Sequence, residues 1–484
     1  MNTKIESIHN ASMTILEEIG IRLLHPEILE LVAGKGIRVT EDRAYFRRDV
    51  LMDWVKRAPR RFTLFARNPA HDSLIGSTAR QFAAGYGCPQ IIAADGTRRN
   101  ACLSDYFHFL KLVHQSPLFR INGGLLVQPD DLPPSQSHAA LTYLALCYSD
   151  KGILGIPGTA DQVQLIMNLA GIVFGGAAGL SAKPRVLTLV NTLSPLRIDT
   201  NTLDTMRVCA RYRQPVIISP GPMAGATGPV TLAGNIALGN AEALAAIAIC
   251  QMLQDGTPVV YGMQATTTDM RTGGVCIGSP GVALQSAYTA ELARSYGLPS
   301  RGGGASTDAP EISVQSGYES MLAMLVACQS RINLIMHAAG VLNSYAAMSY
   351  EQFIADLEIM EMIDYYLQDV TVDKETLALE TIRAAGPGGE FLTQPHTMTH
   401  CRKTTWLSSI GIIGGRSQSK TTGGILARIK TQEAGLLSAY QQPRLPVEMQ
   451  KRLDAYLAEL DIDADRLRDN SHGFHDDGDT TVRS

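Results

Sequence analysis

The 484-residue sequence is poor in charge and has no paired cysteines. Charged residues make up 18% of the chain, and the net charge is −4 without a run of Lys and Arg. A nucleic-acid-binding protein needs a basic stripe, so this class of function is disfavoured. The eight cysteines include no Cys-x-x-Cys pair. This argues against a zinc ribbon or a disulfide framework and favours a reducing, cytoplasmic location.

The sequence also lacks segments typical of secretion or membrane insertion. The first twelve residues contain charges and no apolar core, so no signal peptide is predicted. The apolar run at 229–253 is interrupted by Asn235, Asn240 and Glu242, and predicts a buried helix instead of a membrane span. A mean hydropathy of +0.02 indicates a large core, or a core with a subunit interface, and we expect a homo-oligomer.

Between residues 79 and 370, short apolar segments alternate eight times with helical patterns. This pattern is typical of an α/β fold, the (β/α)8 TIM barrel. An open, doubly wound sheet is the alternative, but no Gly-x-Gly-x-x-Gly motif follows the first strand. The predicted strands are 81–84, 119–122, 152–156, 185–190, 215–219, 258–261, 299–302 and 332–336. The predicted helices are 105–115, 136–148, 160–173, 199–211, 230–253, 282–296, 312–330 and 350–367.

Further segments are predicted on both sides of the barrel. Residues 1–78 contain short helices and strands and are predicted to form an N-terminal α/β cap, acting as a lid or an interface. Residues 371–460 are predicted to form a C-terminal extension that packs on the barrel and ends in an amphipathic helix at 445–460. Residues 461–484 are polar and rich in Asp, so we expect a flexible tail.

A TIM barrel places its chemistry at the carboxyl ends of its strands. No Lys ends a predicted strand, which disfavours a Schiff-base aldolase. No His-x-His pair or carboxylate set lies there either, which disfavours metal-dependent hydrolases and enolase-type enzymes. His396 and His400 are four residues apart but lack a third ligand in register, so no metal site is predicted.

Aromatic and amide side chains remain at the predicted strand ends. Tyr86 and Tyr261 offer ring faces that can hold a cation unable to donate hydrogen bonds. Asn191 and Gln264 can orient a polar substrate without adding charge. Each tyrosine also has a structural alternative, as a core or rim residue.

Arg301 and His337 lie at the ends of the last two predicted strands. Both are candidate partners of a substrate carboxylate. Their structural alternative is a buried ion pair or a satisfied core histidine, and the residues alone leave both interpretations open.

The loop that follows Arg301 contains three consecutive glycines, Gly302-Gly303-Gly304. Such a run lets the backbone approach a large flat group or adopt φ values that other residues avoid. Ser306, Thr307 and Asp308 are predicted to cap the next helix, whose free N–H groups would face the same space.

Six segments form a shared pattern: Asn191-Thr192-Leu193-Ser194-Pro195-Leu196, residues 228–234, residues 258–262, residues 302–308, His337-Ala338-Ala339-Gly340 and Phe391-Leu392-Thr393-Gln394-Pro395-His396-Thr397. As a set they resemble the trimethylamine methyltransferase superfamily of corrinoid-dependent enzymes. The likeness extends from the N-terminal segment to about Trp406. Trimethylamine-specific members have pyrrolysine at the loop around Asp308-Ala309-Pro310, where this chain has ordinary residues. The resemblance therefore points to the non-pyrrolysine branch, which includes glycine betaine methyltransferases.

The resemblance implies transfer of a methyl group from a quaternary amine, glycine betaine or a related betaine, to Co(I) cobalamin on a separate corrinoid protein. The implied cage for the trimethylammonium group consists of Tyr86, Tyr261 and Phe391. The implied residues around the rest of the betaine are Asn191, Gln264, Arg301, His337 and His396. The implied corrinoid contacts are Gly221, Gly302, Gly303, Gly304, Ser306, Thr307 and Asp308.

The chemistry of a quaternary amine agrees with this set of residues. Its nitrogen is already charged, so the departing tertiary amine is neutral and needs no general acid. Alignment and exclusion of water can then supply most of the catalysis, about 7 kcal/mol or more in favourable cases. Three alternatives remain: a pterin-linked barrel methyltransferase, a non-catalytic quaternary-amine binder, and a trimethylamine enzyme without pyrrolysine.

Overall fold

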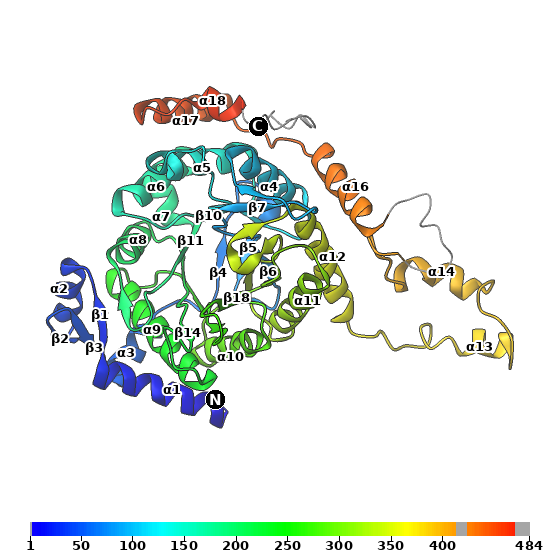
Figure 1. Cartoon of the computed structure of the whole chain (residues 1–484), viewed down its shortest axis with the longest axis horizontal. Helices are drawn as coiled ribbons and strands as arrows, with labels where there is room; N and C mark the ends of the chain where they lie inside the picture. Colours follow the sequence, from blue (N-terminus) through cyan, green and yellow to red (C-terminus); the bar gives the residue numbers. More distant parts are fainter. Residues whose placement is uncertain (1, 413–423, 470–484) are drawn as a thin grey trace.

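We describe the protein from a computed structural model, which describes residues 2–412 and 424–469 (Figure 1). Its centre is a sheet of eight parallel strands that curls into a nearly closed barrel, as predicted. The strands are β6 (Gln81–Phe82), β9 (Ile121–Gly123), β10 (Gly152–Gly155), β11 (Val186–Val190), β13 (Val216–Ile218), β15 (Val259–Gly262), β18 (Ser300–Gly303) and β19 (Leu334–Met336). Their order around the barrel is β6–β19–β18–β15–β13–β11–β10–β9. All eight lie within two residues of the predicted positions.

Side chains alternate between the inside of the barrel and the surrounding helices, because successive residues of a strand point to opposite faces. Val260 of β15 belongs to the inner apolar cluster, whereas its neighbour Tyr261 belongs to the outer one. The inner cluster also includes Phe62, Leu64 and Ile75. These three residues come from the hairpin of β4 (Phe62–Leu64) and β5 (Ser73–Ile75), which therefore fills the end of the barrel opposite the mouth.

Eight helices surround the barrel, each near its predicted position (Figure 1). They are α4 (Leu103–Gln115), α5 (Pro134–Tyr148), α6 (Ala160–Phe174), α8 (Thr200–Arg211), α9 (Leu232–Leu253), α10 (Pro280–Tyr296), α11 (Val314–Gln329) and α12 (Tyr350–Tyr366). Helix α9 is long and apolar enough to cross a membrane, but 94% of its most apolar window is buried inside the protein. It is the buried helix that the sequence predicts. A short helix, α7 (Gly176–Ala182), follows α6 and was not predicted.

The N-terminal segment lies beside the barrel and does not cover its mouth (Figure 1). Helices α1 (Thr3–Thr14) and α3 (Arg48–Val55) both pack against α9. A small sheet joins β1 (Ile21–Leu23), β2 (Arg38–Thr40) and β3 (Arg43–Tyr45) to β12 (Arg197–Ile198), which follows barrel strand β11. The segment is therefore tied to the barrel wall and is not placed as a lid over the mouth, while its predicted role as an interface stays a prediction.

Two small sheets in the loops at the mouth were not predicted from the sequence. One contains β14 (Met223–Ala224), β16 (Thr266–Thr268) and β17 (Val275–Cys276). The other contains β7 (Gln90–Ile92), β8 (Arg98–Asn100), β20 (Val341–Leu342) and β21 (Ala347–Met348). Their two- and three-residue strands are too short to produce a readable alternation of apolar and polar residues.

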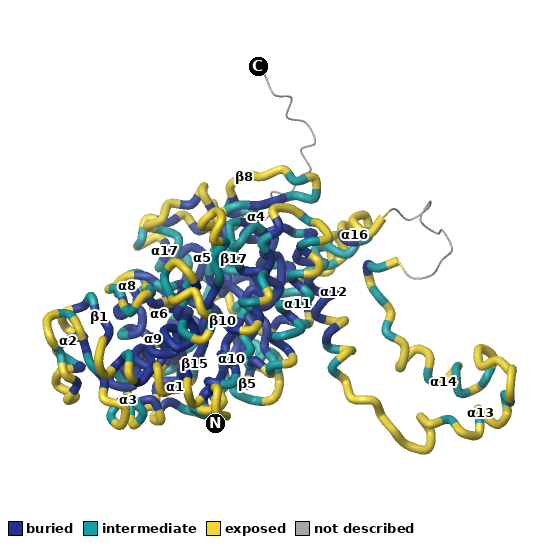
Figure 2. Tube along the Cα trace, turned by 60° about the horizontal axis from the view of Figure 1, so that its bottom comes forward, coloured by how far each residue is buried: buried dark blue, intermediate teal, exposed yellow. Residues whose placement is uncertain are grey.

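The C-terminal extension packs on the barrel only in part. Helix α16 (Ile425–Ser438) packs against α12 and α4, and α17 (Val447–Glu459) packs against α5 and α6. By contrast, α13 (Leu379–Ala385) and α14 (Pro395–Thr404) extend away from the barrel (Figure 2). The predicted flexible tail begins with a helix, α18 (Ala464–Asp469), and residues 470–484 lie outside the described part of the chain.

Candidate active site

Arg301 lies inside the mouth, on barrel strand β18, and is only 1% exposed. Its guanidinium group donates to Ser219 Oγ at 3.1 Å and to Gln264 Oε1, while its Nε has no partner. Burial lowers the pKa of Arg301 to about 10, so the group stays protonated at neutral pH. Within residues 2–412 and 424–469, no carboxylate forms an ion pair with it. A buried cation without a counter-ion is costly, which indicates that an anionic group binds here.

His337 follows β19 and lies beside Arg301 in the mouth. Its backbone has φ +54°, in the left-handed region, and its ring centre is 4.7 Å from that of Tyr345. Burial, and then the charge of Arg301, lower the pKa of His337 to about 3. The imidazole is therefore neutral at physiological pH, and its Nδ1 has no protein partner. It can contact a substrate without adding a second positive charge.

The buried neutral state of His337 predicts a loss of stability in acid. Below pH 6.5 the unfolded chain binds a proton that the folded protein rejects, so stability falls as the pH decreases from 6.5 towards 3. Between pH 7 and pH 5, the free energy of unfolding should fall by about 2 kcal/mol more in the natural protein than in His337→Asn. Urea unfolding at the two pH values measures this difference. Equal losses in the two proteins would show that His337 takes up its proton normally.

Tyr345 is a mouth residue that the sequence analysis missed. It ends the short turn Asn343–Tyr345 between β20 and β21, in which all three residues have positive φ. Its buried hydroxyl accepts a hydrogen bond from Gln264 Nε2 and lies 3.5 Å from Ser306 Oγ. Burial raises the pKa of this phenol, which stays protonated. The sequence signal was weak, because one Asn between two-residue strands is all that indicates the turn.

Asp308 connects three mouth loops and does not cap the following helix. Its carboxylate accepts hydrogen bonds from the backbone N–H of Ile277 at 2.7 Å, the N–H of Gly278 at 3.0 Å and the hydroxyl of Ser344 at 2.7 Å. The cap of α11 is Ser313, whose side chain accepts from Ser316 N. The predicted capping role of residues 306–308 is therefore wrong. Asp308 instead fixes the turn that positions Tyr345.

The glycine run is needed for close packing and not for positive φ. None of the three glycines has a left-handed backbone. A Cβ on Gly302 would clash with Ile332, and one on Gly304 would lie 2.7 Å from Ala338 Cα. Gly302, Gly304, Ser306 and Thr307 are all buried, and Gly304 and Ser306 line a narrow cavity beside Gln264, so their predicted contact with a corrinoid ring stays a prediction. Gly303 is partly exposed and borders the mouth.

Two other glycines at the mouth have free space next to their Cα atoms. A Cβ on Gly87, after β6, would meet no atom within 4 Å. A Cβ on Gly221, after β13, would meet only the carbonyl oxygen of Gln264, at 3.7 Å. Asn191, after β11, is exposed, as expected for a mouth residue.

Of the two predicted cage tyrosines, only Tyr86 lies in the mouth. Its ring packs on the inner cluster, and its hydroxyl donates to Gly155 O, at the end of β10, at 3.0 Å. Tyr261 is fully buried and points outward, where its hydroxyl donates to Asn240 Oδ1 at 2.8 Å and its ring contacts Tyr296 edge-on. The cage role of Tyr261 is wrong, because the pleat of β15 turns Val260 inward and Tyr261 outward.

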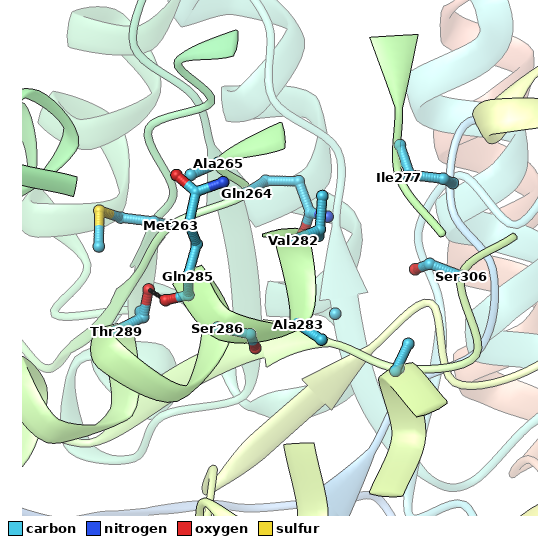
Figure 3. A pocket seen from close by; sticks show the side chains of 13 residues that line it. Met263, Gln264, Ala265, Ile277, Val282, Ala283, Gln285, Ser286, Thr289 and Ser306 are labelled. Atoms are coloured by element: carbon cyan, nitrogen blue, oxygen red, sulfur yellow. Dashed lines mark hydrogen bonds between the residues drawn. The ribbon is translucent and has the colours of Figure 1, made fainter. Parts of the chain in front are cut away.

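Two cavities border these mouth residues. A narrow cavity of about 20 Å³ lies between Gln264, Ser306 and the first turns of α10, and Figure 3 shows the side chains that line it. A larger cavity of about 550 Å³ extends from Tyr86 over the ends of β9 and β10 towards His138. Of these two cavities, the larger lies on the Tyr86 side of the mouth.

Phe391 and His396 do not reach the mouth of their own barrel. Phe391 is 46% exposed, next to α14 in the part of the extension that leaves the barrel (Figure 2). His396, on α14, contacts the carbonyl oxygen of Glu375 at 3.2 Å. No group of three potential metal ligands occurs in the part of the chain that the structure describes.

Lys151, the one deeply buried lysine within residues 79–370, lies far from the mouth residues. Lys151 directly precedes β10, at the end of the barrel opposite the mouth, and is 3% exposed. Its Nζ donates to Val113 O and Ser116 O, each at 2.7 Å, at the C-terminus of α4. Burial lowers its pKa to about 7. Its contacts with carbonyl groups at a helix C-terminus indicate a structural role.

Comparison of the sequence with known proteins identifies its family. The family model described as trimethylamine methyltransferase (MTTB) matches residues 1–461. A glycine betaine methyltransferase of Desulfitobacterium hafniense (strain Y51) is 38% identical over 459 residues, covering 94% of this chain and 95% of its own. A proline betaine:corrinoid methyltransferase of Eubacterium limosum is 28% identical, with 94% and 96% coverage.

Other relatives are named for simpler amines. A trimethylamine methyltransferase MttB of Desulfitobacterium hafniense (strain DSM 10664 / DCB-2) is 28% identical and covers 82% of this chain and 81% of its own. The crystal structure of the Methanosarcina barkeri monomethylamine methyltransferase MtmB aligns over 93% of this chain and 87% of its own, with 11% identity and a TM-score of 0.47. From the match along residues 1–461 and the 38% identical relative, the chain belongs to the trimethylamine methyltransferase family.

Proposed function

We propose that this protein transfers a methyl group from a betaine, a quaternary amine that bears a carboxylate, to a cobalamin presented by a corrinoid protein. The names of the glycine betaine and proline betaine:corrinoid methyltransferases support this function. The observation that favours a betaine over trimethylamine is the buried guanidinium group of Arg301, whose Nε has no partner and which forms no ion pair with a carboxylate in the described part of the chain.

The guanidinium group of Arg301 can donate hydrogen bonds to a betaine carboxylate. Its Nε has no partner, and its Nη1 is held by the neutral side chains of Ser219 and Gln264. A carboxylate that takes the place of the Gln264 amide oxygen would supply the negative counter-charge that Ser219 and Gln264 do not provide. Trimethylamine and choline have no carboxylate and would leave the buried charge uncompensated.

The trimethylammonium end of the substrate needs apolar and aromatic walls. Tyr86 lies on the side of β10, and Tyr345 lies beside His337 on the side of β15 and β18. Both phenols stay protonated and His337 stays neutral, so these three side chains add no formal charge near the ammonium group. A desolvated ring face attracts such a cation by about 2 kcal/mol.

The reaction needs no proton from these residues. When the C–N bond breaks, its electron pair stays on nitrogen, and the product is a neutral tertiary amine. Reduced cobalt of the corrinoid supplies the nucleophile that accepts the methyl group. The protein's residues bind the carboxylate, orient the methyl group towards the opening and exclude water.

The mouth has residues that fit a flat group from another protein. Gly87 and Gly221 have open space above their Cα atoms, so a large planar ring can approach their backbone. Asn191 is exposed at the same end of the barrel. We propose that these three residues border the corrinoid.

A panel of amines tests the proposed function. With Co(I) cobalamin and an equal concentration of each amine, glycine betaine should give dimethylglycine, detected by mass spectrometry. Choline and trimethylamine should react at least about 100-fold more slowly, because one lost charge-assisted hydrogen bond at a buried charge costs about 3 kcal/mol. Proline betaine tests tolerance for a ring next to the nitrogen. Equal rates for choline and glycine betaine would contradict the role of the carboxylate.

A further inference from the structure

Gln264 lies between Arg301 and Tyr345, the two residues assigned to opposite ends of the betaine. It follows β15, and its backbone N–H donates to Pro220 O at 2.7 Å, which holds its backbone in place. Its side-chain oxygen Oε1 accepts a hydrogen bond from Arg301 Nη1, and its Nε2 donates to Tyr345 Oη. The half-buried amide of Gln264 thus accepts the hydrogen bond that Arg301 would otherwise donate to a carboxylate.

The most informative property of the Gln264 side chain is that it carries no charge. A guanidinium group has only donors, so the amide oxygen faces Arg301 and the NH₂ group faces Tyr345. A glutamate of the same shape could serve both partners, because its second oxygen would accept the proton of the Tyr345 hydroxyl. It would also neutralise the buried Arg301 through a stronger, charge-assisted hydrogen bond. Stability alone therefore favours glutamate at this position, whereas the amide leaves the charge of Arg301 available to a ligand.

A cavity beside Gln264 gives its side chain a second position. Gln264, Ser286 and Ser306 line the cavity of about 20 Å³ next to the first turns of α10 (Figure 3). Such a volume admits about one water-sized group. Ser286 Oγ is buried and has no hydrogen-bond partner in the described part of the chain, so it can bond to an amide that turns towards it.

We propose that Gln264 determines whether the mouth accepts a carboxylate-bearing amine, as a neutral side chain that holds Arg301 in the empty site and releases it to the substrate. When a betaine binds, the Gln264 amide turns from Arg301 towards Ser286, and the carboxylate takes over its hydrogen bond. This inference rests on the proposed function, because the carboxylate must bind Arg301. It adds that the charge of residue 264 decides between betaines and amines without a carboxylate, such as choline.

Isothermal titration calorimetry with glycine betaine and choline tests the role of residue 264 without any methyl transfer. In Gln264→Glu the dissociation constant for glycine betaine should rise at least about 100-fold, because the new carboxylate already pairs with Arg301 and repels that of the substrate. Choline should bind at least about 10-fold more tightly than to the natural protein, because Arg301 no longer presents an uncompensated positive charge. The melting temperature of Gln264→Glu should also rise, since the buried guanidinium group gains a counter-ion. A residue with only a structural role would not reverse the preference between the two amines.

Two further variants separate the charge of the side chain from its shape. Gln264→Met keeps the length of the side chain and adds no charge, so it should still prefer glycine betaine over choline by at least about 10-fold. Gln128→Glu adds the same charge at an exposed position after β9 and should keep the natural preference. The proposal is overturned if Gln264→Glu keeps the natural preference, or if Gln264→Met loses glycine betaine binding as completely as Gln264→Glu. A natural protein without any preference between the two amines would instead contradict the function proposed for Arg301.

Crystals of the natural protein, grown with and without glycine betaine, test the movement without any variant. In the betaine complex, Gln264 Oε1 should have left Arg301 Nη1, and the amide should lie within hydrogen-bonding distance of Ser286 Oγ. A carboxylate bound to Arg301 Nε, with Gln264 still bound to Nη1, would overturn the proposal and leave the proposed function standing.

Discussion

Arg301→Met is expected to lower kcat/KM for glycine betaine by about 100- to 1,000-fold and to raise the melting temperature. The loss of activity follows from removing a charged hydrogen-bond donor from a buried site, which costs about 2–5 kcal/mol in binding. The gain in stability follows because Arg301 is a buried cation without a counter-ion, and replacing buried charges with apolar residues is often stabilising by about 1–4 kcal/mol. Opposite changes in activity and stability are typical of a functional residue.

The matched control is Arg271→Met. Arg271 lies in a mouth loop, but its side chain is 88% exposed and pairs with Asp269. An exposed ion pair contributes about 0–1 kcal/mol, so both activity and melting temperature should stay close to those of the natural protein. Steady-state kinetics and differential scanning calorimetry measure the two effects. If Arg301→Met lowers the melting temperature, the arginine is a structural residue and the account of the site is wrong.

Tyr345→Ala is expected to raise the dissociation constant for glycine betaine by about 30-fold, which corresponds to about 2 kcal/mol for a desolvated cation–π contact. Tyr345→Phe keeps the ring face and loses only the hydroxyl contacts to Gln264 and Ser306, so its affinity should change by less than about 10-fold. Isothermal titration calorimetry measures each value.

Tyr261→Phe provides the comparison at a tyrosine outside the mouth. The change removes the hydrogen bond from Tyr261 to Asn240, which stabilises the outer layer by about 1 kcal/mol, and leaves the mouth unchanged. Its betaine affinity should equal that of the natural protein. If affinity falls in Tyr261→Phe and not in Tyr345→Ala, the substrate lies elsewhere.

The barrel could be predicted from the sequence because its signals are local and repeated. Each buried strand is a short apolar run, and each helix has a periodic apolar face, so the eight units could be placed to within a few residues. Arg301 and His337 could also be placed in the mouth, because each ends such a run.

The incorrect and unconfirmed site predictions depend on geometry that one sequence does not contain. Tyr261 was placed in the mouth because it ends a strand, but a shift of one residue in the pleat reverses the direction of a side chain. Gly302 and Gly304 look like a cradle for a ligand, yet their missing side chains make room for Ile332 and Ala338. Tyr345 lies in a strained turn between two-residue strands, which has almost no sequence signal.

Phe391 and His396 were assigned from the resemblance alone. The structure places them in the segment that leaves the barrel after α12, outside their own mouth (Figure 2). An assignment made through a family motif thus does not establish that the residue lies in the mouth of its own chain.

A crystal structure of the protein with glycine betaine tests the central claim most directly. The account predicts one carboxylate oxygen within hydrogen-bonding distance of Arg301 Nε or Nη1, with the trimethylammonium group near Tyr86 or Tyr345 and a methyl group facing the opening. A betaine bound in the 550 Å³ cavity near His138, with Arg301 still bound only to Ser219 and Gln264, would contradict it.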